Sequence, residues 1–177
     1  MTRREGLATL LGAHVPADEL EAAHLARMQA FAHELEDPLS REQQTAHFTA
    51  SALVVDAQRR RTFLVRHGKL GRWFQPGGHV EHDDGSMLKA ALREAHEETG
   101  FALRPVSEDA LDVDVHEFPA RDGHEAHLHL DVRFLLVAEG APRSEAAEEG
   151  AWFDRVAALA IADDAGLHRL IEKGLPR

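Results

Sequence analysis

The chain has 177 residues, which fits one domain with a sizeable core, or one domain with a helical extension, rather than two domains. Its net charge of −11 disfavours non-specific binding to nucleic acid or to an anionic membrane, and a polyphosphate ligand would need local basic groups or a metal. The composition, 44% hydrophobic and 29% charged, is that of a soluble globular protein, and the absence of cysteine excludes disulfides and thiolate metal sites.

Residues 1–44 predict a helical extension. In the stretch 18–35 apolar residues recur at helical spacing, and Pro38 ends this helix. A shorter helix is expected over about residues 3–11. The apolar run at the N-terminus is short and broken by Pro16, so it is a poor signal peptide, and no stretch of about 18 apolar residues predicts a membrane span. The expected location is the cytoplasm.

From about residue 45 the pattern becomes that of strands. The segments 47–56 and 61–67, separated by a polar turn, predict a hairpin. In 125–140 polar and apolar residues alternate, which predicts a half-buried strand. The remaining elements expected in the C-terminal part are a short strand at 151–153 and helices at 154–161 and 165–174.

Between these strands, a helix is expected from about Ser86 to Thr99. Ser86 is suited to cap its N-terminus, and Gly100 stands where a left-handed residue commonly follows a helix. One side of the helix is small and apolar enough to lie against a sheet. The residues predicted on that side are Leu88, Ala91, Leu92, Ala95 and Thr99.

Another arc of the same helix, about 100° wide, carries Glu94, Glu97 and Glu98. Like charges three and four residues apart repel by about 0.2 to 0.5 kcal/mol per pair. Arg93 lies one turn before Glu97 and can pair with it, whereas no basic residue lies one turn from Glu94 or Glu98. Taken alone, such a run most often marks a solvated acidic face.

A glycine-rich turn, Pro76-Gly77-Gly78, precedes this helix and changes the interpretation. Glycine lets the backbone turn tightly and leaves carbonyl groups free to approach an ion. Carboxylates together with a carbonyl form a ligand set suited to a hard divalent cation such as Mg²⁺ or Mn²⁺. We therefore expect a metal site formed by the turn and the helix.

Gly78, the loop after it and the segment REAHEETGF (93–101) resemble the Nudix hydrolase signature, G-x5-E-x7-R-E-U-x-E-E-x-G-U, where U is bulky and aliphatic. The Arg-Glu pair, the Glu-Glu pair and the final glycine match position by position. A pattern with this many fixed points is far more specific than a lone glycine motif.

The chain departs from the signature in its loop. One additional residue lies between Gly78 and Arg93, and Asp84 stands in place of the loop glutamate. Asp84 is expected to pair with Arg93, as the family's loop glutamate does, with the additional residue compensating for its shorter side chain. Glu81, three residues upstream, is the competing partner.

The resemblance implies the family's α/β/α sandwich over a domain at 45–177, with an N-terminal extension at 1–44. Its sheet is expected to be mixed and mostly antiparallel, with the signature helix on one face and a C-terminal helix on the other. The N-terminal helices would pack onto this body or onto a partner subunit, which leaves a homodimer open.

The resemblance also implies an activity: metal-dependent hydrolysis of a nucleoside diphosphate linked to another moiety, by attack of water on a phosphorus. The substrate would be a small nucleotide-type molecule. Catalytic roles fall on Arg93 and the three glutamates of the helix, with structural support from Gly78, Asp84 and Gly100. The implied ligands of Mg²⁺ or Mn²⁺ are the Gly77 carbonyl, Glu94, Glu97 and Glu98.

The sequence leaves alternatives open for two points, the identity of the general base and the class of reaction. The base is either Glu94 or a glutamate of a later loop, whose candidates are Glu145, Glu148 and Glu149, each of which also fits a surface carboxylate. A non-catalytic ligand-binding or regulatory protein, or an isomerase-type relative, is the alternative to a hydrolase. The complete set of signature glutamates favours hydrolysis.

Other side chains have both a functional and a structural interpretation. Three basic residues just before the glycines suit phosphate contact or solvated strand ends: Arg66, Lys69 and Arg72. His127 and His129 share a strand face with Asp131, which suits zinc, substrate contact or a polar face without metal. Trp73 suits stacking on a base or packing against the sheet.

Overall fold

The structure is a computed structural model that describes residues 2–68, 71–118, 120 and 125–177. Its elements are α1 (Arg3–Ala13), α2 (Glu19–Glu34), β1 (Ala46–Val55), β2 (Arg61–His67), β3 (Arg72–Phe74), β4 (Gly77–His79), α3 (Met87–Thr99), β5 (Leu103–Pro105), β6 (Asp112–Phe118), β7 (His127–Ala138), β8 (Glu149–Asp154), α4 (Arg155–Ile161) and α5 (Ala165–Gly174). The predicted helices, hairpin and C-terminal strand are confirmed. Among these residues, no helix has the length and apolar character needed to cross a membrane.

Strand β1 is the centre of a mixed sheet. It runs parallel to β7 along its whole length and antiparallel to β2 and β4. Strands β3 and β8 pair with β2, and β5 and β6 pair with β7, all antiparallel. The expectation of a mixed, mostly antiparallel sheet is confirmed.

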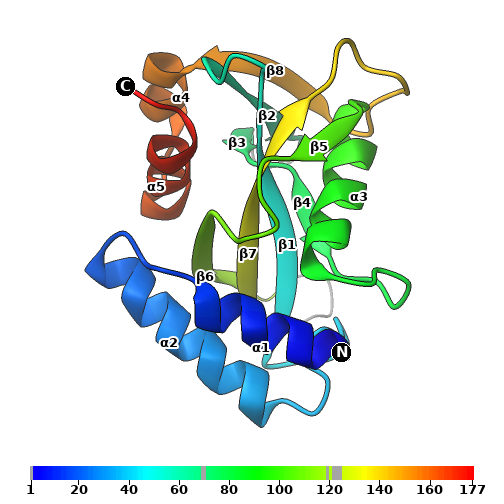
Figure 1. The fold of residues 1–177 in the computed structure, drawn as a ribbon, viewed down its shortest axis with the longest axis vertical. Coiled ribbons are helices and arrows are strands. Elements are labelled where there is room, and N and C mark those ends of the chain that lie inside the picture. Colours follow the sequence, from blue (N-terminus) through cyan, green and yellow to red (C-terminus); the bar gives the residue numbers. More distant parts are fainter. Residues whose placement is uncertain (1, 69–70, 119, 121–124) are drawn as a thin grey trace.

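Helices cover both faces of this sheet, because side chains in a strand alternate between faces. Even-numbered β1 residues such as Phe48 and Ala50 pack with Ala91 of α3. Odd-numbered residues such as Leu53 pack with Ile171 of α5. Figure 1 shows α3 on one side of the sheet, α4 and α5 on the other, and α1 and α2 across one end. The predicted α/β/α sandwich is confirmed.

The two N-terminal helices pack onto the body of this chain. Leu7, Leu11 and Met28 belong to the same apolar core as Phe48. The buried carboxylate of Glu21 on α2 accepts hydrogen bonds from the Val113 backbone N–H of β6, at 3.2 Å, and from Lys173 Nζ of α5, at 2.6 Å. Of the two alternatives for these helices, the structure therefore favours packing on the body.

Strand β7 differs from the half-buried strand predicted by its alternation. From Leu130 onward all of its residues are buried, and Asp131 and Arg133 are only 2% and 3% exposed. Arg133 donates hydrogen bonds to Asp131 at 2.8 Å, Asp114 at 3.0 Å and Asp112 at 3.3 Å. Asp131 and Arg133 therefore lie within a buried ionic network, and the prediction of a half-buried strand was wrong for the part from Leu130 onward.

Candidate active site

Helix α3 begins and ends as expected. The Ser86 hydroxyl accepts the Lys89 backbone N–H at 3.2 Å, and Gly100 follows the helix with φ of 72°, in the left-handed region that glycine favours. Leu88 and Leu92 are partly buried against the core. The fully buried residues of the helix are Met87, Ala90, Ala91, Ala95 and Thr99. The apolar face that the sequence predicts is thus the one that lies on the sheet.

The two glycines of β4 permit close packing between the strand and its neighbours. A Cβ at Gly78 would lie 2.6 Å from the Cδ and Oε2 atoms of Glu94, and one at Gly77 would lie 2.2 Å from the Cβ of Ser51. The Gly77 backbone N–H donates to Glu98 Oε2 at 3.0 Å. Glu94 and Glu98 are therefore held against the glycine turn, where the sequence placed a metal site.

Arg93 and Asp84 form the expected pair. The guanidinium donates from Nε to Asp84 Oδ1 at 3.1 Å and from Nη2 to Asp84 Oδ2 at 2.7 Å. Arg93 Nη2 also donates to the His79 carbonyl at 2.9 Å, and the Glu81 backbone N–H donates to Asp84 at 2.8 Å. Asp84, and not the Glu81 side chain, is the partner of Arg93, so the additional residue lies between Asp84 and Arg93.

The pKa of Asp84 reflects this pairing. Burial of the carboxyl acts to raise the pKa, but the hydrogen bonds from Arg93 and from the Glu81 N–H outweigh it and hold the pKa below its usual value. Asp84 is therefore ionised at neutral pH, and its charge holds Arg93 between the loop and the helix.

Glu94 lies next to a cation that helical spacing did not predict. Arg93 Nη1 lies 2.9 Å from Glu94 Oε1 and 3.6 Å from Glu97 Oε2. Helical spacing predicts partners one turn away, because adjacent helix residues do not normally face each other. The guanidinium is drawn back by Asp84 and the His79 carbonyl, which brings it within reach of Glu94. The predicted pairing of Arg93 with Glu97 is confirmed.

Glu98 stands apart from the other two glutamates. Among the described residues, no Lys, Arg or His nitrogen lies within 4.0 Å of its carboxylate, and its one hydrogen bond comes from the Gly77 N–H. Burial, together with the negative charges of Glu94, Glu148 and Glu97, raises the pKa of Glu98 to about 7. Burial likewise raises the pKa of Glu94, although Arg93 opposes the shift.

The loop before β8 docks on the C-terminal end of α3. The Arg143 N–H donates to the Gly100 carbonyl at 2.8 Å, and the Ala147 N–H donates to the Glu97 carbonyl at 3.0 Å. A Cβ at Gly100 would lie 2.4 Å from the Ser144 carbonyl oxygen, so only glycine allows this approach.

This docking separates the three loop glutamates. The Glu148 N–H lies 3.4 Å from the Glu98 carbonyl, and the negative charge of Glu148 contributes to the raised pKa of Glu98. Glu149 lies at the start of β8, 3.7 Å from Arg66 of β2. Among the described contacts, Glu145 has neither a hydrogen bond nor an ion pair. Glu148 is therefore the one that the structure brings to the helix.

The basic residues before the glycines are engaged elsewhere. Arg66 pairs with Glu149, and Arg72 pairs with Asp163 and lies 5.4 Å from the centre of the Phe74 ring. Lys69 lies outside the described residues. These contacts leave phosphate binding by these side chains a prediction.

Trp73 is partly buried among the residues that pack beneath α5, and its ring meets Phe153 edge-on with centroids 4.9 Å apart. This contact favours the sheet-packing interpretation over stacking on a base.

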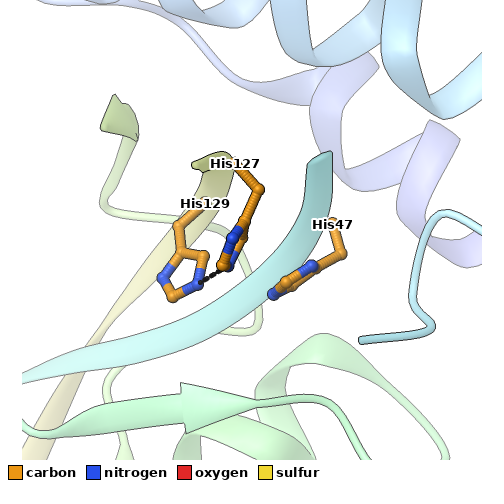
Figure 2. A group of neighbouring side chains, drawn as sticks. All are labelled: His47, His127 and His129. Carbon is orange, nitrogen blue, oxygen red and sulfur yellow. Dashed lines mark hydrogen bonds between the residues drawn. The ribbon is translucent and has the colours of Figure 1, made fainter. Parts of the chain in front are cut away.

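His127 and His129 of β7 lie beside two histidines that sequence reasoning missed. His47 of β1 is directly paired with His129, and His79 of β4 is paired with Thr49 on the same face. Figure 2 shows His47 facing the two β7 rings. The pairing of β1 with both β7 and β4 brings these residues together, so periodicity within one segment gives no signal for them.

A NUDIX domain family model matches residues 45–173. A probable DHNTP pyrophosphohydrolase from Lactococcus lactis subsp. cremoris is 36% identical over 93 residues, which are 51% of this chain and 54% of that protein. The m7GpppN-mRNA hydrolase NUDT17 from Xenopus laevis is 37% identical over 93 residues, 49% of this chain and 31% of that protein. The match thus spans about half the length of the first relative and about a third of the second.

Solved structures share the fold. The C. elegans Ap4A hydrolase aligns over 71% of this chain and 93% of its own, with 21% identity and a TM-score of 0.51. The E. coli dihydroneopterin triphosphate pyrophosphohydrolase aligns over 71% and 92%, with 17% identity and a TM-score of 0.51. At these identities the likeness establishes the arrangement of the elements.

Proposed function

Since the chain belongs to the Nudix family, we propose that it is a metal-dependent pyrophosphohydrolase acting on a small nucleotide-type substrate. The reaction is hydrolysis of the pyrophosphate bond in a nucleoside diphosphate linked to another moiety, with water attacking phosphorus. Relatives named as pyrophosphohydrolases support this reaction class. We also propose the division into an extension at 1–44 and a Nudix domain at 45–177, with which the extent of the family match agrees.

The observation that carries the proposal is the carboxylate of Glu98. It is partly buried beside other carboxylates, and within the described chain no cation offsets its charge. A carboxylate in such surroundings either binds a proton or lies next to a cation. Oxygen donors of this kind fit Mg²⁺ or Mn²⁺, and the residues that would hold it are Glu94, Glu97, Glu98 and the Gly77 carbonyl.

A divalent cation bound there would neutralise the pyrophosphate charge and make a water molecule more nucleophilic. The chain's own residues hold this ligand set in place. Asp84 and Arg93 tie the loop to α3, and Gly78 leaves room for the Glu94 carboxylate. Gly100 lets the later loop approach the helix end and so present Glu148.

For the general base we propose Glu148, with Glu94 as the alternative. A base must have an unprotonated oxygen that is free to accept a proton from water. One carboxylate oxygen of Glu94 already accepts a hydrogen bond from Arg93 at 2.9 Å, so this oxygen is less free to accept a proton from water. Glu148 is exposed and lies in the loop docked on α3, next to Glu98.

The test is a substrate panel with Mg²⁺ or Mn²⁺, read by mass spectrometry. The panel contains nucleoside diphosphate sugars, nucleoside triphosphates and dinucleoside polyphosphates, and ¹⁸O-water shows which phosphorus is attacked. Cleavage of a pyrophosphate bond by the parent, and its loss in Glu98→Gln, supports the proposal. Binding without turnover would favour a regulatory protein, and rearrangement without ¹⁸O uptake would favour an isomerase.

A further inference from the structure

Three histidine side chains converge on the face of the sheet opposite α3. His47 lies on β1, and His127 and His129 lie on β7, which pairs with β1 in parallel. One ring nitrogen from each residue lies within 4.8 Å of the other two. Figure 2 shows the three side chains close together beside β1 and β7, with the His127–His129 contact marked.

His47 has a buried nitrogen that needs a partner. The residue is 3% exposed, and its Nε2 atom has no hydrogen-bond partner among the described residues. Its Nδ1 lies 3.3 Å from the Gln43 carbonyl. Because a carbonyl only accepts, the proton is on Nδ1 and the Nε2 lone pair is unshared. A buried acceptor with no donor calls for a ligand at that position.

His127 is oriented in the same way. Its Nδ1 lies 2.9 Å from the Glu125 carbonyl, which again places the proton on Nδ1 and leaves Nε2 as an acceptor. That Nε2 lies 3.2 Å from His129 Nε2. An imidazole whose far N–H is held by a backbone carbonyl is the arrangement typical of histidine ligands to metals.

Burial favours the neutral form of His47 and His129, which is the form that ligates metal. Burial, together with the charge that neighbouring imidazoles would carry, lowers the pKa of His79 to about 4 and that of His129 to about 3. Burial also lowers the pKa of His47. Phe118 stacks on His129 with ring centroids 5.0 Å apart, so an apolar ring covers one side of the group.

We propose that His47, His127 and His129 form a binding site for a divalent transition metal of the zinc class, separate from the glutamate site. Imidazole nitrogens suit Zn²⁺ and its neighbours, whereas Mg²⁺ prefers oxygen. With Zn–N bonds of about 2.0 to 2.1 Å, tetrahedral ligand nitrogens lie about 3.4 Å apart, so the most separated pair must close by at most about 1.4 Å. Three protein ligands leave the fourth position open to water or an anion.

Metal binding by the full-length, tag-free chain tests this site. The protein is stripped with a chelator, returned to excess Mg²⁺ to occupy the glutamate site, and titrated with Zn²⁺ by calorimetry. We expect one tight equivalent. His127→Gln and His129→Gln should weaken it by more than about 100-fold, since loss of even an outer partner costs about 10- to 100-fold. Co²⁺ should give visible absorption typical of a low coordination number in the parent only.

Two controls distinguish the outcomes. His168→Gln removes a half-exposed histidine of α5 and should leave Zn²⁺ affinity unchanged. Glu94→Gln changes the other site and should also leave it unchanged. Equal Zn²⁺ affinity in the parent and in correctly folded His127→Gln and His129→Gln would overturn the proposal, as would loss of affinity in Glu94→Gln alone. Thermal unfolding without metal checks that each variant is folded.

Discussion

Two groups of acidic side chains in this molecule differ in how their negative charge is compensated. One is the network between β6, β7, α2 and α5, where Glu21, Asp112, Asp114 and Asp131 are buried. The other is the row of glutamates on α3. The difference between them lies in where the compensating positive charge comes from.

In the network, the chain supplies the cations. Arg133 donates to three of the aspartates, Arg169 donates to Asp112 at 2.7 Å, and Lys173 donates to Glu21 at 2.6 Å. Burial acts to raise the pKa of Asp114, but the hydrogen bond with His116 and the charge of Arg133 outweigh it and lower the pKa. Only at Asp112 does burial prevail and raise the pKa.

On α3, the chain supplies one guanidinium for three glutamates, and Asp84 takes two of its hydrogen bonds. Glu98 receives a single backbone N–H, and its pKa rises to about 7. The buried carboxylates of the network have their cations within the chain, whereas a carboxylate without one among the described residues indicates a place for an external cation. This contrast supports the proposed metal site more directly than the motif does.

The largest effect should come from Glu98→Gln. The substitution keeps the size and the hydrogen bond from Gly77 but removes the charge that would hold the metal. We expect hydrolysis to fall by several orders of magnitude while the fold persists, measured as turnover on the best substrate of the panel and by circular dichroism. Turnover within tenfold of the parent would remove Glu98 from the site.

In the network the same kind of change should affect stability. Arg133→Met leaves Asp112, Asp114 and Asp131 short of their shared cation, and breaking a buried pair costs about 3 to 5 kcal/mol. Urea unfolding measures the loss. Arg104→Met is the control, because its pair with Glu139 is exposed and contributes at most about 1 kcal/mol. Equal losses of stability in Arg133→Met and Arg104→Met would contradict the role of Arg133 as the cation of the buried network.

In the metal-free protein, the free energy of unfolding should depend on pH because the pKa of Glu98 is raised. Its pKa is raised from 4.5 to about 7 on folding, so the native state holds the proton more tightly than the unfolded state. The contribution of protonated Glu98 to the free energy of unfolding is fully present below pH 4.5. It is lost as the pH rises through about 7, by at most about 1.4 kcal/mol per pH unit. Glu98→Gln should flatten this part of the profile. An unchanged slope in the variant would assign it to another group.

A smaller effect is expected at Asp84, whose proposed role is to hold the loop rather than to ligate the metal. Asp84→Ala should weaken metal affinity and turnover by about 10- to 100-fold, as for other outer partners of a metal site. Glu81→Ala is the control, since only its backbone joins the loop contact. Full activity in Asp84→Ala would mean that the Arg93 pair is dispensable.

Local signals were sufficient for part of the site. The caps and apolar face of α3, and the pairing of Asp84 with Arg93, follow from residues close in sequence. The partner of Glu94 was missed because it depends on how Arg93 is drawn back by Asp84 and His79, which helical spacing does not encode. The burial of Asp131 and the meeting of His47 with His129 depend on strand register, and one segment's periodicity carries no information about its neighbour.

Thermal unfolding in the presence of metal tests most directly whether the Glu98 carboxylate binds an external cation. An ion that binds only the native state stabilises it by about 2.7 kcal/mol at 100 times its Kd. The parent should unfold at a higher temperature as Mg²⁺ or Mn²⁺ is added at neutral pH, and Glu98→Gln should respond much less. An equal shift in both proteins would contradict the account.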